Sequence, residues 1–83
     1  MQNKNPVWTV KEAYPHKDYT ITVKFRDGSV KLFDAKPLLS IPIYEQLKNP
    51  GFFMQAHVEC HTVVWNDEID IAPEYLYEAG KIL

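Results

Sequence analysis

The sequence has few of the residues that several specialised classes of protein require. It contains one cysteine, Cys60, among 83 residues, so no disulfide can form within the chain and we expect a reducing, cytoplasmic location. No run approaches the roughly 18 apolar residues of a membrane span, and residues 1–5 form a polar lead-in without an export signal. The three glycines, at positions 28, 51 and 80, are too few and too scattered for a phosphate loop or a dinucleotide fingerprint.

The composition is that of an ordinary small globular protein. Apolar residues make up 46% of the chain and charged residues 24%, close to the averages for soluble domains. The length is about half that of a typical domain of roughly 150 residues. We therefore expect a single domain over residues 1–83 with a small core.

Charge is unevenly divided along the chain. Residues 1–58 hold eight basic and five acidic side chains, whereas residues 59–83 hold one basic and six acidic side chains. This asymmetry is typical of a polar interaction surface or of complementary self-association, although two solvated faces would produce it as well.

Alternating polarity predicts a β-hairpin in the first half of the chain. After a first strand at residues 7–14, apolar side chains occupy every second position from Tyr19 to Phe25. Asp27-Gly28 then predicts a two-residue type I′ turn, in which Gly28 adopts a positive φ.

This loop length sets the expected register of the hairpin. Apolar residues then meet on one face, as in the pair of Phe25 and Val30. The opposite face carries three cations and one aromatic ring, which we expect to meet solvent or a partner: Lys24, Arg26, Lys31 and Phe33.

The remaining sequence predicts short helices, then strands and a last helix. Asp34 is suited to cap a helical turn at residues 35–39, and a further helix from Ser40 or Pro42 would place Ile43 and Leu47 on one face. Strands follow at residues 56–60 and 62–66 and around Asp70, and Pro73 begins a helix that Gly80 ends. Trp65 and Leu76 are expected to join the last hairpin to this helix.

The order of these elements predicts an α+β domain. We expect a small, mainly antiparallel sheet of about five strands, β-β-β-short helices-β-β-α, with helices packed on one side.

Several motifs in this order resemble one bacterial family. They are the Asp27-Gly28 turn, the segments Phe33-Asp34-Ala35-Lys36-Pro37-Leu38-Leu39 and Tyr44-Glu45-Gln46-Leu47, Trp65, and the ending Leu76-Tyr77-Glu78. Over residues 6–79 the chain resembles the Domain of Unknown Function 2442 family, in which a glycine-rich turn replaces Glu59-Cys60-His61. The resemblance implies a small α+β fold, no established activity and frequent genetic neighbourhood with small toxin-like proteins. We expect Tyr77 to have a structural role. Some relatives carry a helix-turn-helix, but nothing of that kind follows Leu83, so direct reading of DNA is not expected.

One short segment holds residue types that could bind metal or act as nucleophiles. On an extended strand His57, Glu59 and His61 share a face while Cys60 points to the other, so Cys60 cannot form a local site with either histidine. We expect a partly buried, inert Cys60, and no metal site, catalytic residue or cofactor.

The acidic residues near the C-terminus do not have the spacing of a calcium-binding loop. We expect Asp70 to satisfy backbone donors near the start of the helix at Pro73, and Glu74 to favour the positive end of its dipole. Asp67 and Glu68 form an acidic turn and are candidate partner-binding residues.

Eleven aromatic residues are many for so small a core, and Trp8, Tyr14 and Phe33 are candidate anchors for a partner. We therefore predict a non-enzymatic module that binds another protein, a toxin-like neighbour being the suspected partner and a homodimer another possibility.

Two alternatives remain open. One is a nucleic-acid-associated accessory domain that uses Lys24, Arg26 and Lys31, against which the single arginine and the pI of 5.8 argue. The other is a small metal-dependent enzyme.

Overall fold

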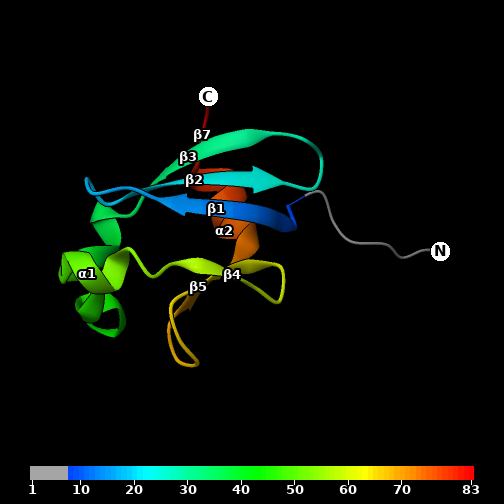
Figure 1. Cartoon of the computed structure of the whole chain (residues 1–83). Coiled ribbons are helices and arrows are strands. Elements are labelled where there is room, and N and C mark those ends of the chain that lie inside the picture. Colours follow the sequence, from blue (N-terminus) through cyan, green and yellow to red (C-terminus); the bar gives the residue numbers. More distant parts are fainter. Residues whose placement is uncertain (1–7) are drawn as a thin grey trace.

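The computed structural model describes residues 8–83 (Figure 1). The lead-in at residues 1–5 and Val7, the start of the first predicted strand, lie outside these residues. The elements in chain order are β1 (Val10–Pro15), β2 (Thr20–Phe25), β3 (Val30–Asp34), the 3₁₀ helices η1 (Lys36–Ser40) and η2 (Pro42–Lys48), α1 (Pro50–Phe53), β4 (His57–Glu59), β5 (Thr62–Val64), β6 (Asp70–Ile71), α2 (Pro73–Ala79) and β7 (Lys81–Ile82).

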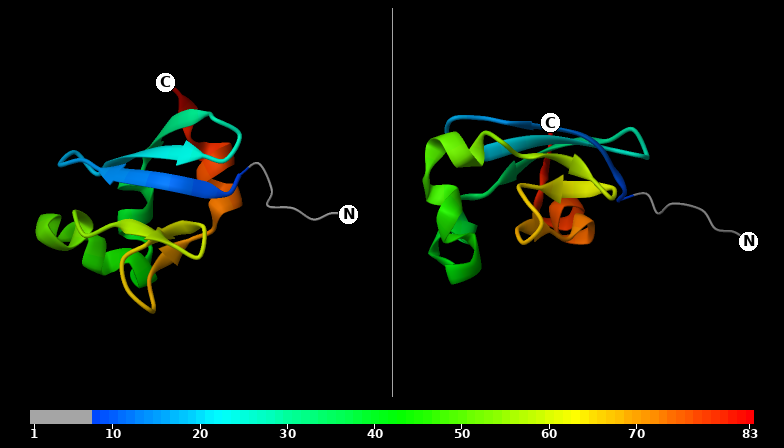
Figure 2. Two further views of the ribbon diagram at one scale, coloured as in Figure 1. Left: turned by 45° about the vertical axis from the view of Figure 1, so that its right-hand side comes forward. Right: turned by 60° about the horizontal axis from the view of Figure 1, so that its bottom comes forward.

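The strands form two antiparallel sheets, with the orders β1-β2-β3-β7 and β4-β5-β6. This confirms the α+β class, but one sheet of about five strands is replaced by sheets of four and three. Figure 2 shows the smaller sheet and α2 on the same side of the larger sheet, with η1, η2 and α1 gathered at one end. Among residues 8–83, no helix is long and apolar enough to cross a membrane.

The core lies between the larger sheet and the elements that cover it. Strand β2 contributes Ile21, Val23 and Phe25, all buried as their alternation predicts. Residues from the other elements complete one cluster with them, including Phe33, Leu47, Phe53, Val63, Trp65, Ile71 and Leu76.

The register of the β2–β3 hairpin differs by one residue from the prediction. Val23 pairs with Lys31, and Lys24 pairs with Val30. The loop has three residues, because the Gly28 N–H donates to the Phe25 carbonyl and the Phe25 N–H donates to the Ser29 carbonyl, both at 3.0 Å. Gly28 does adopt the expected positive φ, 90°, but it closes a three-residue loop with a bulge and not a type I′ turn.

A shift of one residue moves every side chain of β3 to the other face of the sheet. Phe33, expected on the outer face, is 1% exposed in the core, and Lys31 is 9% exposed on the same face. Lys24 and Arg26 remain exposed. The predicted surface that combined all three cations with Phe33 is therefore wrong.

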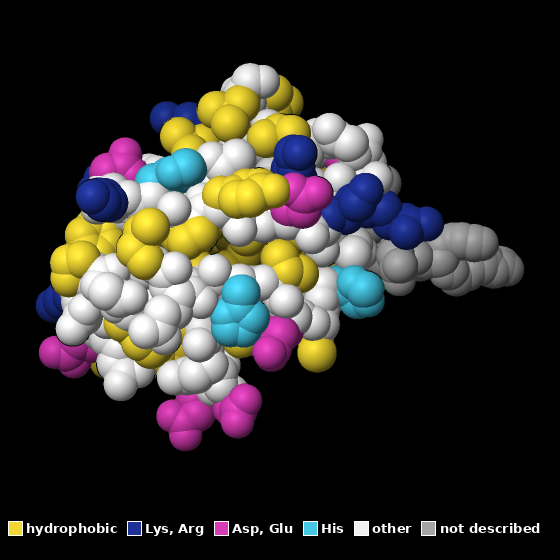
Figure 3. All heavy atoms as spheres, viewed as in Figure 1, with side chains coloured by type: hydrophobic (Ala, Val, Ile, Leu, Met, Phe, Trp, Pro, Cys, Tyr) yellow, Lys and Arg dark blue, Asp and Glu magenta, His cyan; other side chains and the backbone are white. Residues whose placement is uncertain are grey.

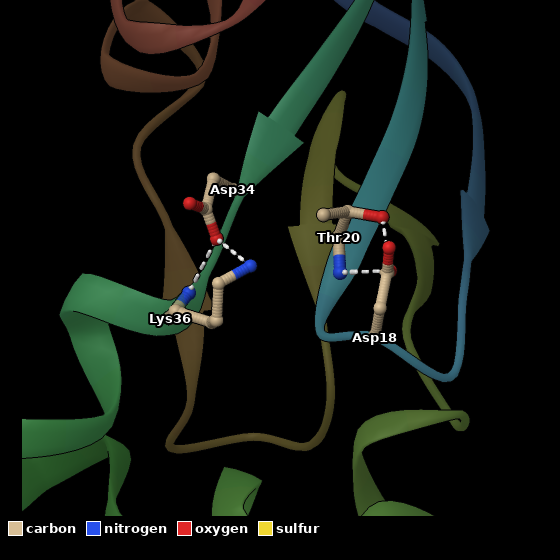
Figure 4. Close-up of polar contacts among 4 residues, drawn as sticks. All are labelled: Asp18, Thr20, Asp34 and Lys36. Carbon is tan, nitrogen blue, oxygen red and sulfur yellow. Dashed lines mark hydrogen bonds and ion pairs between the residues drawn. The ribbon is translucent and has the colours of Figure 1, made fainter.

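The helical segment after β3 begins one residue later than predicted and is wound more tightly, as a 3₁₀ helix. Its N-cap is Ala35, without a side-chain cap, so Asp34 is not the capping residue that was predicted. Oδ1 of Asp34 accepts a hydrogen bond from the Lys36 N–H at 3.0 Å, next to a similar Asp18–Thr20 contact (Figure 4). In η2, Leu47 is buried but Ile43 is 61% exposed, so the predicted shared face is wrong. A 3₁₀ helix has about three residues per turn, and Tyr44 takes the place beside Leu47.

The C-terminal helix α2 has the predicted bounds and buries Leu76. Its N-cap is Ala72, whose methyl side chain cannot accept a hydrogen bond. Asp70 lies two residues earlier, in β6, so the capping role predicted for Asp70 is wrong. Gly80 ends the helix at a negative φ. A Cβ there would lie 2.8 Å from the Leu76 carbonyl oxygen, so close packing is what favours glycine.

Candidate functional site

The smaller sheet has an apolar inner face and an outer face that carries its charged side chains. On its inner face, Val63 of the central strand β5 pairs with Val58 and Ile71. On its outer face, Glu59 pairs with Thr62, while His57 and Asp70 flank Val64. Alternation along three short strands thus directs the charged residues away from the core.

The outer face borders a hollow of about 210 Å³. Three of its lining residues are carboxylates, Glu59, Asp67 and Asp70, and all three are exposed. The other lining residues are uncharged: Cys60, Thr62, Val64 and Asn66. The hollow therefore presents negative charge without a lysine or arginine in its lining.

The loop before β6 is held by one side chain. Oδ1 of Asn66 accepts hydrogen bonds from the backbone N–H groups of Glu68 and Ile69, at 2.8 and 2.9 Å. This Asx-type turn leaves Asp67 and Glu68 exposed. We call Glu59, Asp67, Glu68 and Asp70 the acidic surface.

His57 is the titratable basic neighbour of this surface. Its Nδ1 lies 2.9 Å from the Gln55 carbonyl oxygen, and its Nε2 lies 3.3 Å from Oε2 of Glu59. The hydrogen bond to Gln55, assisted by Glu59, raises the pKa of His57. Protonation of His57 therefore places a positive charge beside Glu59.

Cys60 and His61 form the two-residue turn between β4 and β5, with φ angles of 51° and 67°. Because they lie in a turn, the alternation expected of a strand does not apply to them. Cys60 is exposed, which corrects the expected partial burial. Within residues 8–83, no group of three or more His, Cys, Asp or Glu side chains is arranged to hold a metal ion.

The three aromatic candidates for partner binding differ in exposure. Tyr14 is 48% exposed on β1, and its hydroxyl donates to Oε1 of Glu12, which raises the pKa of Tyr14. Trp8 is half-buried. Phe33 is in the core, where its ring meets that of Tyr75 edge to face at 5.6 Å, so its role as an exposed anchor is wrong.

A polar contact missed by the sequence analysis joins the β2–β3 loop to α2. The Tyr77 hydroxyl donates to Oδ2 of Asp27 at 2.7 Å. Nζ of Lys31 donates to the Tyr77 carbonyl oxygen at 2.6 Å and lies 3.6 Å from the centre of the Tyr77 ring. Lys31, proposed from the sequence as a binding residue, therefore stabilises the packing of the helix.

This contact predicts an acid-sensitive contribution to stability. Hydrogen bonds from the hydroxyl and N–H of Ser29 and from the Tyr77 hydroxyl lower the pKa of Asp27 to about 2, against about 3.9 for an unperturbed Asp. The contribution is complete above about pH 4 and is lost as the pH falls towards 2. We expect Asp27→Asn to reduce the fall in melting temperature between pH 4 and 2, and Tyr77→Phe to reduce it less; identical profiles for Asp27→Asn and wild type would contradict the contact.

The fold and these contacts define a small α+β domain with an acidic outer surface on its smaller sheet. The sequence model of the family described as "Protein of unknown function (DUF2442)" matches residues 10–81, so the chain belongs to that family. This confirms the resemblance drawn from the motifs. Comparisons with curated proteins and with solved structures gave no match.

Proposed function

We propose that this domain is a non-enzymatic module that binds a basic segment of another protein through its acidic surface. The observation that carries the proposal is the gathering of Glu59, Asp67 and Asp70 around one hollow without a cation in its lining. Glu68 extends the negative charge into a neighbouring hollow, which Glu45 also lines. Figure 3 shows acidic side chains projecting from the lower end of the molecule, whereas basic side chains lie at the right-hand end and along the left side.

The chemistry of the partner follows from this local excess of negative charge. Exposed carboxylates attract lysine- and arginine-rich segments, increase the rate of encounter and repel nucleic acid. The small toxin-like proteins expected beside the genes of this family are the suggested partners. The nucleic-acid alternative has lost its main support, because Lys31 does not share a face with Lys24 and Arg26.

Charge reversal at the acidic surface tests the proposal. We expect the double variant Asp67→Lys/Glu68→Lys to slow association with a purified basic neighbour by about tenfold or more at low salt, and to flatten the salt dependence of the rate. The matched control is Lys17→Glu/Lys24→Glu, which reverses two exposed lysines away from this surface and should change the rate by less than about threefold. Association kinetics at low and moderate salt provide the measurement.

Four outcomes would contradict the proposed function. An unchanged rate for the acidic variant, or an equal loss in the control, would exclude the acidic surface as the binding site. Tighter binding of wild type to an oligonucleotide than to the basic protein would favour the nucleic-acid class. Concentration-dependent sedimentation of wild type that the acidic variant abolishes, without binding to the neighbour, would favour a homodimer.

A further inference from the structure

A third hollow, of about 500 Å³, lies where the two sheets meet, and we call it the junction hollow. Its lining residues come from the start of β1, the β2–β3 loop and the β4–β5 hairpin: Thr9, Val10, Lys11, Arg26, Val58 and His61. The volume is within the range of small-molecule sites, about 300–1,000 Å³.

The charge of the junction hollow is opposite to that of the acidic surface. Lys11, Arg26 and His61 converge on it from segments far apart in the sequence, and none of its lining residues is acidic. Glu12 is the adjacent carboxylate in β1, but it is engaged by Tyr14 and by Lys24, whose Nζ lies 3.7 Å away. None of the ion pairs found within residues 8–83 includes Lys11, Arg26 or His61.

Backbone hydrogen bonds hold the three basic residues in place. The Val10 N–H donates to the His61 carbonyl oxygen at 3.0 Å, and the Arg26 N–H donates to the Thr9 carbonyl oxygen at 2.8 Å. These bonds link the segments that carry all three basic side chains. Because the segments are already joined, little ordering of the backbone is required when a ligand binds.

Two unusual backbone features border the same hollow. The register of β1 against β2 shifts between Val10 and Glu12, at Lys11. Shifts of this kind change the direction of a side chain and are frequent next to functional sites. His61 has a φ of 67°, a conformation that costs energy for a residue other than glycine and is concentrated at functional sites. The turn therefore keeps histidine at a position for which glycine is the least strained residue.

We propose that the junction hollow binds the phosphate group of a small organic molecule. The guanidinium of Arg26 can donate two parallel hydrogen bonds to phosphate oxygens, Lys11 supplies a compact positive charge, and the His61 imidazole offers a further donor. The side chains of Val10 and Val58 provide apolar surface for the organic part of the ligand. A nucleic-acid strand is the less suitable ligand, since its backbone requires a longer track of cations on a chain of net charge −2.

Titration of the full chain, followed by the shifts of its backbone amide resonances, tests this site. The probes are inorganic phosphate, adenosine 5′-monophosphate and a short single-stranded oligonucleotide, with sodium chloride at matched ionic strength. We expect saturable shifts at Lys11, Arg26 and His61 with the first two probes, and tighter binding of the nucleotide than of inorganic phosphate. Sodium chloride should give no saturable shift.

Two variants and a control connect these shifts to the basic side chains. Arg26→Gln should raise the Kd for the nucleotide by about tenfold or more, because it removes a charge-assisted pair of hydrogen bonds. His61→Asn removes the imidazole but retains a residue type that tolerates positive φ, and should raise the Kd about threefold or more. Lys17→Gln removes an exposed cation of the β1–β2 turn that does not line the hollow and should change the Kd less than twofold.

Four results would overturn the proposal. The first is the absence of saturable shifts with both phosphate and nucleotide, and the second is an equal effect of Arg26→Gln and Lys17→Gln. The third is stronger binding of the oligonucleotide than of the mononucleotide at equal phosphate concentration. The fourth is self-association of wild type that Arg26→Gln abolishes, without nucleotide binding, which would indicate contact between two copies. Amide spectra confirm that each variant is folded. The acidic surface is not involved, so this test is independent of the proposed protein partner.

Discussion

Replacing Leu76 with alanine is expected to lower the free energy of unfolding by about 2–5 kcal/mol. Leu76 is fully buried on α2 within the core cluster that both sheets share. Its truncation removes apolar contacts and leaves a cavity that short, paired elements cannot readily close. Native domains are stable by only roughly 0.05–0.15 kcal/mol per residue, so this loss would remove a large part of the total stability.

Urea denaturation followed by circular dichroism measures the effect of Leu76→Ala. Glu78→Ala is the matched control, because Glu78 is exposed on the same helix, and it should change the free energy by less than about 0.5 kcal/mol. If Leu76→Ala does not fold, Leu76→Met, expected to cost less than about 1.5 kcal/mol, supplies a variant that can be measured. Wild-type stability in Leu76→Ala would show that α2 does not pack on the core.

Local sequence patterns predicted the elements that have a clear alternation of side chains or clear end signals. The stretch from Tyr19 to Phe25 has a single apolar face, and the helix at Pro73–Ala79 has proline at its start and glycine at its end. The strand predicted around Asp70 is present as β6, whereas the two-residue strand β7 has no such pattern. Strand β7 exists because Lys81 and Ile82 pair with Leu32 and Lys31, which are remote in the sequence.

The acidic surface was predicted in part. Asp67 and Glu68 were recognised as an exposed acidic turn, and the charge asymmetry of residues 59–83 located the region. The contributions of Glu59 and Asp70 depend on strand pairing that brings them to one hollow. The strands predicted at residues 56–60 and 62–66 require a connection near His61, but its turn type could not be predicted, because residues other than glycine seldom adopt positive φ and the sequence there contains no glycine.

The hairpin register was wrong because the sequence supports both loop lengths. Residues 30–33 are Val-Lys-Leu-Phe. One register places Val30 and Leu32 towards the core and the other places Phe33 there, so either register buries an apolar side chain. Asp27-Gly28 suits a two-residue turn, but glycine also closes a three-residue loop. Contact of Asp27 and Lys31 with Tyr77 of α2 belongs to the longer loop and cannot be read from the hairpin alone.

The register itself predicts the relative cost of truncating two adjacent residues of β3. Phe33→Ala is expected to lower the free energy of unfolding by about 3–5 kcal/mol, because Phe33 is buried opposite Ile21 and its ring contacts Tyr75. Leu32→Ala should cost only about 1 kcal/mol, since Leu32 is half-buried on the outer face. A two-residue loop would reverse this order, because it places Leu32 in the core and Phe33 outside. Urea denaturation of both variants measures the difference, and a larger loss for Leu32→Ala would show that the three-residue loop, and with it the burial of Lys31, is wrong.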